Sequence, residues 1–276
     1  MKYKAFFCDF DGTLCTRDEY VSPANREAIK KYIAAGGRFI LNTGRMTAPT
    51  HKILVSLGID KQTVPMIGYN GAHAADKDGN TIFCKFLPLE TLKQVIEIAK
   101  NHNTYMHFYD PQYVYAAERN EINAWYEHLT GSPIKAVGDL AAYVDANPDL
   151  TPMKIMIVRE NQSDEEWNKL VGAVGDANLG GVEYYMTTKN YLEFVSSDAG
   201  KAAGMKAVAD IYGIPLSGCV AMGDGQNDTG MIRAAGLGIA PASANADVRA
   251  AADVIAPRAD EDAVAWVINK YCMEEI

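Results

Sequence analysis

The feature of this sequence that most restricts its fold is a repeated order of short apolar run, polar loop and helical segment. Near the N-terminus, apolar runs lie at 3–10, 38–45 and 65–71, and helical patterns separate them. Short apolar runs that end in turn residues are typical of strands buried on both faces. Strands that alternate with helices at this spacing form parallel sheets through right-handed crossovers. The sequence therefore predicts an α/β fold.

Helix boundaries are visible in the same region. Ser22 followed by Pro23 predicts a helix start, because serine caps the first turn and proline is tolerated within it. Gly36 and Gly37 are expected to end that helix. A second helix is expected over 47–57, ended by Gly58.

The middle of the chain has a different pattern. We expect a hairpin over 75–87, a helix over 90–102, strands over 153–160 and 182–188, and a helix over 163–174. The segment 190–197 is interpreted as the return to the first pattern, which resumes with a helix at 201–212 and a strand at 219–224. We predict a Rossmann-like, doubly wound parallel-sheet core of residues 1–82 and 188–276, interrupted by an inserted α+β domain of residues 83–187. A chain of 276 residues is long enough for this arrangement.

Composition excludes several classes of protein. The net charge is −9 and the pI is about 5.1, which argues against a nucleic-acid partner, because phosphate backbones need a basic face. Five scattered cysteines without a CxxC pair indicate a reducing compartment. No stretch approaches the roughly 18 apolar residues that span a bilayer, and the apolar run before Asp9 is too short for a signal peptide. We expect a cytoplasmic protein without a membrane partner; no feature of the sequence indicates an oligomeric state.

Two aspartates stand where the first predicted strand ends, in Asp9-Phe10-Asp11-Gly12-Thr13. In an extended chain, residues i and i+2 point the same way, so we expect Asp9 and Asp11 to face one spot at the carboxyl edge of the sheet, where open α/β folds bind ligands. Adjacent carboxylates repel each other unless a cation or a shared proton lies between them. A hard ion with oxygen ligands, such as Mg²⁺, is the expected solution. An acidic turn at the end of a strand is the alternative interpretation of this motif alone.

Three further motifs follow apolar runs or precede a helix. The stretch 223–228, Gly-Asp-Gly-Gln-Asn-Asp, places more carboxylates at a second strand end. Thr43-Gly44-Arg45 offers a hydroxyl and backbone N–H groups, which suit phosphate oxygens. Lys201 follows Ser-Ser-Asp-Ala-Gly. Each of these, taken alone, also fits an ordinary turn or helix start.

Taken together and in this order, the motifs resemble the haloacid dehalogenase superfamily of phosphatases. FFCDFDGTL resembles its first motif, ILNTGR its second, Lys201 its third and AMGDGQND its fourth. IGYNGAHAAD resembles the Asn-Gly-Ala signature of the Cof-like subfamily, subclass IIB, whose large cap corresponds to the inserted domain. The resemblance implies a phosphoric monoester hydrolase that requires Mg²⁺ and acts on small phosphate esters, most commonly sugar phosphates, with flavin mononucleotide and pyridoxal phosphate also used.

The resemblance also implies residue roles. Asp9 is the expected nucleophile, which forms an aspartyl-phosphate, and Asp11 the expected general acid and base. Mg²⁺ would bind Asp9, the backbone carbonyl of Asp11, and Asp224. Asp228 is expected to orient Lys201 or a metal-bound water. The phosphoryl group would be held by the backbone of Phe10 and by Thr43, Gly44, Lys201 and Asn227.

One departure from the family pattern and two alternative functions remain. The family's Met-Gly-Asn-Ala stretch after the fourth motif is replaced here by Pro241-Ala242-Ser243-Ala244. A phosphosugar mutase would use the same aspartate pair and return the phosphoryl group to the substrate. A non-catalytic module that binds phosphorylated metabolites would bind them without turnover.

Overall fold

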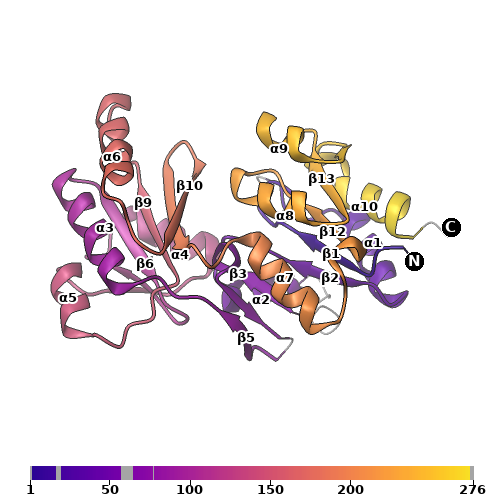
Figure 1. Cartoon of the computed structure of the whole chain (residues 1–276), viewed down its shortest axis with the longest axis horizontal. Helices are drawn as coiled ribbons and strands as arrows, with labels where there is room; N and C mark the ends of the chain where they lie inside the picture. The colour runs from indigo at the N-terminus through magenta and orange to yellow at the C-terminus, as the bar shows by residue number, and fades with distance from the viewer. Residues whose placement is uncertain (1, 17–19, 57–64, 77, 274–276) are drawn as a thin grey trace. The chain divides into compact units, whose positions relative to one another are not determined.

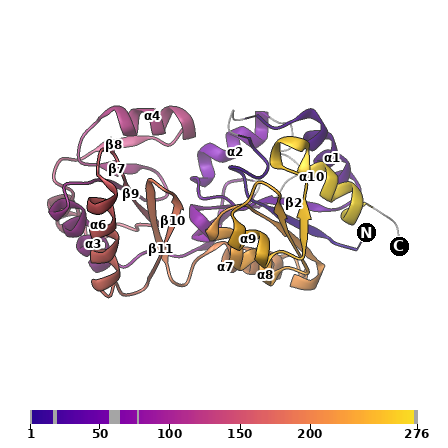
Figure 2. The ribbon, with the colours of Figure 1, turned by 90° about the horizontal axis from the view of Figure 1, so that it is seen from above.

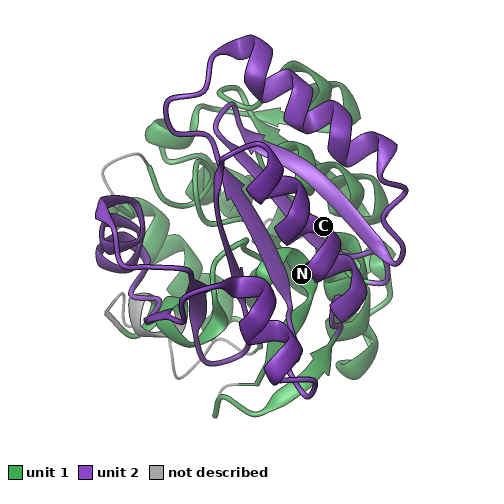
Figure 3. Ribbon diagram, turned by 90° about the vertical axis from the view of Figure 1, so that its left-hand side faces the viewer, with its two compact units in different colours: residues 1–84, 199–276 green, residues 85–198 purple. Residues whose placement is uncertain are grey.

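The computed structural model describes residues 2–16, 20–56, 65–76 and 78–273. The chain divides into two compact units (Figure 3): the first consists of Met1–Cys84 and Ala199–Ile276, and the second of Lys85–Asp198. Figure 1 labels their helices and strands. Within the described ranges, every helix is too short or too polar to cross a membrane.

A five-stranded parallel sheet forms the first unit's core, in the order β14–β13–β12–β1–β2. Its strands are β1 (Ala5–Cys8), β2 (Arg38–Leu41), β12 (Cys219–Met222), β13 (Leu237–Pro241) and β14 (Val254–Ala256). β1 lies between β2 and β12, and Cys8 pairs with Met222. Strand ends that are more than 200 residues apart in the sequence are therefore neighbours in the sheet.

Helices cover both faces of this sheet (Figure 2). They are α1 (Pro23–Ala34), α2 (Thr47–Ser56), α7 (Lys201–Ile211), α8 (Thr229–Ala234), α9 (Ala246–Ala251) and α10 (Ala263–Val267), which continues as a π-helix, η5 (Ile268–Cys272). Side chains of β1 alternate between the faces: Phe6 and Cys8 pack with residues of α1 and α10, whereas Ala5 and Phe7 pack with residues of α7 and α8. The predicted doubly wound α/β core is confirmed.

The first helix begins as its sequence predicts. The hydroxyl of Ser22 accepts a hydrogen bond from the N–H of Asn25 at 3.1 Å, and Pro23 occupies the first turn. This cap satisfies one of the N–H groups that the first turn leaves without a helical partner. The predicted end of the second helix, at 57 and Gly58, lies outside the described residues.

The third strand differs from its expected role in the parallel sheet. β3 (Met66–Gly68), β4 (His73–Ala75) and β5 (Thr81–Cys84) form a separate antiparallel sheet. An isolated parallel bridge between Asn42 and Ile67 connects β3 to the end of β2. After β3 the chain turns sharply through a 3-10 segment, η1 (Tyr69–Gly71), which also shortens the predicted strand 65–71.

The second unit contains a mixed sheet in the order β10–β11–β9–β6–β7–β8. Its strands are β6 (Tyr105–Tyr109), β7 (Val114–Ala116), β8 (Ile134–Ala136), β9 (Lys154–Val158), β10 (Val182–Thr188) and β11 (Tyr191–Ser196). Its helices are α3 (Leu89–Asn101), α4 (Glu121–Thr130), α5 (Leu140–Ala146) and α6 (Asp164–Asp176). The unit is the expected α+β module, although α4, α5 and β8 were not anticipated from the sequence pattern.

The boundary of this unit differs from the predicted 83–187. The second unit spans Lys85–Asp198. The segment 190–197, interpreted from the sequence as the return to the first unit, contains β11, a strand of the second sheet. β11 pairs antiparallel with both β10 and β9, and Phe194 pairs with Ile155 of β9. A strand between two others cannot be assigned to a connecting segment, so the inserted unit includes it.

A group of polar side chains is buried on one face of this second sheet. His107 is fully buried, and its two ring nitrogens lie 3.1 Å from the Tyr105 hydroxyl and 2.8 Å from the Tyr109 hydroxyl. Nearby, the ammonium of Lys154 lies 2.8 Å from Glu193, and both residues are buried. Burial, reinforced by the charge of Lys154, lowers the pKa of His107 to about 3.

This shift makes the stability of the protein depend on pH. The unfolded chain takes up a proton at His107 below its ordinary pKa of 6.5, whereas the folded chain does not. The contribution is fully present above pH 6.5 and is lost as the pH falls toward 3; between pH 7 and pH 5 the loss is about 2 kcal/mol. In urea unfolding, we expect His107→Gln to remove this part of the pH dependence. His128→Gln, an exposed control on α4, should behave like the wild type; an unchanged pH dependence in His107→Gln would contradict the assignment.

Candidate active site

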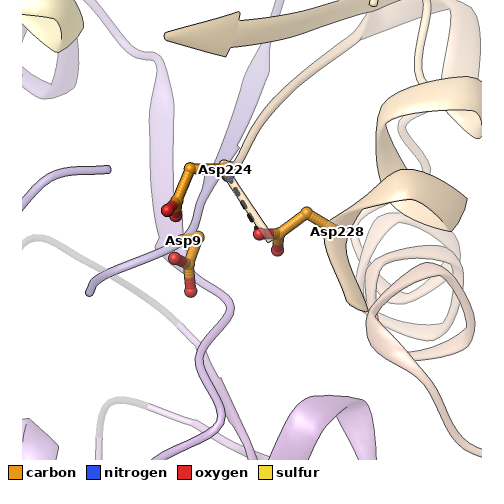
Figure 4. Close-up of side chains that lie close together, drawn as sticks. All are labelled: Asp9, Asp224 and Asp228. Carbon is orange, nitrogen blue, oxygen red and sulfur yellow. Dashed lines mark hydrogen bonds between the residues drawn. The ribbon is translucent and has the colours of Figure 1, made fainter. Parts of the chain in front are cut away.

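Three carboxylates meet where β1 and β12 end (Figure 4). Asp9 directly follows β1, and its N–H donates to the carbonyl of Met222, the last residue of β12, at 2.9 Å. Asp224 follows β12, and Asp228 ends the short 3-10 segment η3 (Gln226–Asp228). One carboxylate oxygen from each of the three lies within 4.8 Å of the other two. The expected meeting of the first and fourth motifs at one sheet edge is thus observed.

A buried lysine joins this cluster from the N-terminus of α7. The ammonium of Lys201 lies 2.5 Å from Asp9 Oδ1 and 2.6 Å from Asp228 Oδ1. Burial on its own would lower the pKa of Lys201, but the attraction of Asp228 and Asp9 outweighs it and raises the pKa above its ordinary value. Lys201 is therefore a charged group with fixed partners.

The hydrogen-bonding capacity of Asp228 is largely used by the protein itself. Its Oδ1 accepts from Lys201, and its Oδ2 accepts from the N–H groups of Asp224 at 3.0 Å and Gly225 at 2.9 Å. It is 1% exposed. This geometry supports the predicted orienting role of Asp228 and indicates that it holds both Lys201 and the loop that carries Asp224.

The carboxylate of Asp224 lies against Thr13 and Gly12. Its Oδ1 accepts from the Thr13 hydroxyl at 3.0 Å. Gly12, at φ +81°, approaches it so closely that an added Cβ would lie 2.6 Å from Oδ2. A side chain at position 12 would therefore displace the carboxylate, and the backbone there takes a conformation that glycine adopts readily.

The charges of this cluster do not balance. Three carboxylates face one ammonium, so two negative charges remain when all four groups are ionised. Burial raises the pKa of Asp9 well above its ordinary range; Lys201 opposes this shift, whereas Asp228 and Asp224 add to it. Burial, with repulsion from Asp228, also raises the pKa of Asp224, to about 6. A compact set of carboxylate oxygens with an excess charge of −2 fits a hard divalent cation.

Asp11 does not join Asp9 in the way the sequence predicted. The chain is not extended there, because the carbonyl of Phe10 accepts from Leu14 and Cys15 in a turn. The Asp11 carboxylate instead pairs with Arg45, whose Nη2 lies 2.6 Å from Oδ1 and whose Nε lies 2.8 Å from Oδ2. The side chain of Asp11 is 53% exposed, and it is not part of the described acidic cluster. The expectation that both side chains face one spot is therefore wrong for this structure.

The predicted phosphate-holding residues have different surroundings in the structure. Lys201 lies within the acidic cluster, as described above. Gly44 and Asn227 are brought together through Asn70: the Asn227 amide donates to Asn70 Oδ1 at 2.9 Å, and a Cβ on Gly44 would lie 2.8 Å from that same oxygen. The Thr43 hydroxyl is buried and accepts from the N–H of Arg45 at 3.2 Å. Phe10 is buried, with the Arg45 guanidinium 5.0 Å from its ring centre.

Sequence reasoning gave no role to three residues that organise the site. Thr13 and Arg45 belong to sequence motifs, but their partners could not be predicted, because only the fold brings them to Asp224 and Asp11. Asn70 was quoted within a signature. Asn-Gly directly after an apolar run indicates a left-handed turn, and this signal could have directed attention to it.

The departure at 241–244 leaves the adjoining loop in contact with the site. The N–H of Asn245 donates to the carbonyl of Asp224 at 3.2 Å, and the N–H of Ala244 closes a turn to the carbonyl of Pro241 at 2.9 Å. Arg249 also donates to the carbonyl of Ala244. The loop therefore supports the Asp224 backbone, although Pro241-Ala242-Ser243-Ala244 stands where the family has Met-Gly-Asn-Ala.

Comparison with known proteins agrees with this geometry. A protein-family model described as haloacid dehalogenase-like hydrolase matches residues 6–268. The chain is 24% identical to 5-amino-6-(5-phospho-D-ribitylamino)uracil phosphatase YitU of Bacillus subtilis over 278 residues, which cover 95% of each protein. Its structure is similar to that of a haloacid dehalogenase-like hydrolase from Bacteroides thetaiotaomicron, with a TM-score of 0.84, 25% identity and coverage of 98% and 99% of the two chains. It is also similar to a subclass IIB sugar phosphatase, with a TM-score of 0.81, 21% identity and coverage of 98% and 100%.

The family match spans both segments of the parallel-sheet core as well as the inserted unit. It therefore includes the strand ends that carry Asp9 and Asp224 and the helix that begins at Lys201. The chain belongs to the haloacid dehalogenase-like hydrolases.

Proposed function

We propose that this protein is a Mg²⁺-dependent phosphatase that hydrolyses small phosphate monoesters through a phosphorylated Asp9. The observation that carries the proposal is the cluster of Asp9, Asp224 and Asp228 around the ammonium of Lys201. Phosphoryl transfer depends mainly on positioning and on compensation of charge. A buried carboxylate with a fixed cationic neighbour, next to a site suited to a divalent ion, provides both.

In the first step, a carboxylate oxygen of Asp9 attacks phosphorus. A bond forms between that oxygen and phosphorus, and the bond from phosphorus to the ester oxygen breaks. Asp11 gives a proton to the departing oxygen, which leaves as an alcohol. Covalent attack divides one difficult displacement into two easier steps.

In the second step, water attacks the same phosphorus and the bond to Asp9 breaks. Asp11, now ionised, takes a proton from the water, so both residues return to their starting state. The side chain of Asp11 is half exposed and is paired with that of Arg45. The observed pairing occupies both of its carboxylate oxygens. We propose that Asp11 leaves Arg45 and takes up a proton from solvent before it acts at the ester oxygen.

Asp9, Asp224 and the backbone carbonyl of Asp11 are the proposed ligands of Mg²⁺. When bound, the ion would offset the repulsion between the anionic carboxylate and the anionic phosphate. The Asp228 carboxylate already accepts from Lys201 and two N–H groups, so its proposed role is to hold these neighbours in place. The phosphoryl oxygens would accept hydrogen bonds from Thr43, Gly44, Lys201 and Asn227 and from the backbone of Phe10.

The proposed substrates are phosphate esters of sugars and sugar alcohols. The relative YitU is named as a phosphatase of a compound with a phosphorylated ribityl group, which derives from the sugar alcohol ribitol. Flavin mononucleotide and pyridoxal phosphate belong in the same test, since both are small phosphate monoesters.

The direct test is hydrolysis of a panel of phosphate esters by the purified protein, with Mg²⁺ or with EDTA. We expect release of inorganic phosphate with Mg²⁺, loss of activity in EDTA, and recovery when Mg²⁺ is added in excess. Asp224→Asn should raise the Mg²⁺ concentration needed for half-activity by about tenfold or more, since it weakens a ligand. Asp260→Asn, an exposed control in the same unit, should not.

Three outcomes would contradict the proposal. Full activity in EDTA would exclude the metal requirement. Transfer of the phosphoryl group to a second position of the sugar, without release of inorganic phosphate, would instead identify a mutase. Tight binding of a phosphate ester without turnover would identify a binding protein.

A further inference from the structure

The turn after β3 has an unusual backbone. Tyr69, Asn70 and Gly71 have φ values of +53°, +54° and +92° in succession. Left-handed backbone is uncommon in residues other than glycine and is energetically costly for them. Asparagine tolerates it best, whereas a bulky tyrosine does not. Such a turn persists only where its surroundings hold it.

The surroundings of this turn are parts of the proposed site. The N–H of Tyr69 donates to the carbonyl of Arg45 at 2.9 Å, and the N–H of Asn70 donates to the carbonyl of Thr43 at 3.0 Å. A Cβ on Gly71 would lie 2.0 Å from the carbonyl oxygen of Gly200, the residue before Lys201. The turn is therefore packed between the Thr43–Arg45 loop and the start of α7.

The side chain of Asn70 acts on one proposed phosphate donor. Asn70 is fully buried, and its Oδ1 accepts from Nδ2 of Asn227 at 2.9 Å. A carboxamide nitrogen carries two N–H groups. When one of them is fixed on Asn70, the orientation of the other is fixed too, and this second N–H is available for a phosphoryl oxygen.

The backbone of Asn70 acts on a second donor. Thr43 and Gly44 share a planar trans peptide, in which the C=O and the N–H point in opposite directions. Asn70 binds the carbonyl of Thr43, so it sets the direction of the N–H of Gly44. Gly44 lacks a side chain at the point where Asn70 Oδ1 approaches it, and a Cβ there would lie 2.8 Å from that oxygen.

We infer that Asn70 is a positioning residue that orients the Asn227 amide and the Gly44 N–H toward the phosphoryl group. It does so without being one of the proposed phosphate contacts. The inference rests on the proposed function, because that proposal assigns the phosphate contacts. The left-handed conformation is what lets one residue present its own N–H to Thr43 and its side chain to Asn227.

The test separates the side chain from the backbone. Asn70→Gly keeps the left-handed backbone, which glycine adopts readily, and removes the side chain together with its contact to Asn227. We expect its Kd for inorganic phosphate, measured by calorimetry with Mg²⁺ present, and its KM for a phosphate ester to rise about tenfold, with a melting temperature close to that of the wild type. Asn178→Gly replaces another left-handed asparagine, at φ +45° and exposed in the second unit, and should change neither value.

A double-mutant cycle then asks whether Asn70 acts through Asn227. In an Asn227→Ala background, adding Asn70→Gly should change phosphate affinity by less than about twofold, since the group it orients is gone. An independent tenfold effect in that background would overturn the inference, as would wild-type phosphate affinity in Asn70→Gly itself.

Failure of the proposed function gives a different result. A wild-type protein that binds phosphate but does not hydrolyse esters would remove the phosphatase proposal, and the affinity measurements would still decide the role of Asn70. A wild-type protein that does not bind phosphate at all would overturn both.

Discussion

Asp9→Asn is expected to lower the rate of ester hydrolysis by at least about 10³-fold, as loss of a nucleophile does in other covalent enzymes. The amide matches the carboxylate in shape but cannot attack phosphorus as an anion. The fold should survive, because burial already raises the pKa of Asp9 and makes its ionised form costly in the folded protein. We therefore expect a melting temperature equal to or above that of the wild type in EDTA.

Trapping of the intermediate makes this prediction specific to a nucleophile. Acid quenching of the wild type with an ester labelled in its phosphoryl group should leave label on the protein, and Asp9→Asn should leave none. Asp210→Asn, an exposed change on α7, is the matched control and should retain both label and turnover. Turnover above a few per cent of the wild type in Asp9→Asn would show that another group attacks phosphorus.

The core of this site could be predicted because buried strands and the residues at their ends are local features of the sequence. Asp9 and Asp224 each follow a buried apolar strand, and parallel strands end at one edge of a sheet. The sequence does not state which strands are neighbours. The family resemblance supplied that step, and the pairing of β1 with β12 agrees with it.

The unexpected direction of the Asp11 side chain has one local cause and one long-range cause. Periodicity of two applies only while the chain remains extended, and β1 ends at Cys8. Beyond it, the turn at Phe10 and the charge of Arg45 decide where Asp11 points. Arg45 is 34 residues away in sequence, so no local pattern reveals the pair.

The predicted boundary of the inserted unit differs from the observed one for a related reason. β11 reads as an ordinary strand, and nothing within its sequence states which sheet it joins. Its assignment depends on pairing with β9 and β10, which is a long-range property. Local patterns identified the elements more reliably than they identified the partners of those elements.

Lys201→Met is expected to impair both stability and activity. Its ammonium is the shared cationic partner of Asp9 and Asp228, and all three side chains are buried. Removing one partner of a buried ion pair leaves uncompensated charge and costs about 3–5 kcal/mol. Without the lysine, the pKa of Asp9 should rise further, because Lys201 is the group that opposes the effect of burial on it. Asp9 would then be protonated over a wider pH range and unable to attack.

The expected measurements are a free energy of unfolding about 3 kcal/mol below that of the wild type in EDTA at pH 7, and a value of kcat/KM reduced by about 10²–10³-fold. Part of the stability should recover as the pH is lowered, since protonation of Asp9, whose pKa is raised by burial, removes one buried charge. Lys206→Met is the matched control: it lies on the same helix, pairs with Asp210 on the surface, and should lose less than about 1 kcal/mol.

The double variant Lys201→Met with Asp228→Asn distinguishes charge from chemistry. It removes one of the two carboxylates left without their cationic partner, so part of the lost stability should return. Activity should not return, because the ammonium proposed to hold the phosphoryl oxygens is still missing. If activity recovered together with stability, Lys201 would be needed only to neutralise the buried carboxylates. If Lys201→Met were as stable and as active as Lys206→Met, the buried ion-pair cluster would have neither role.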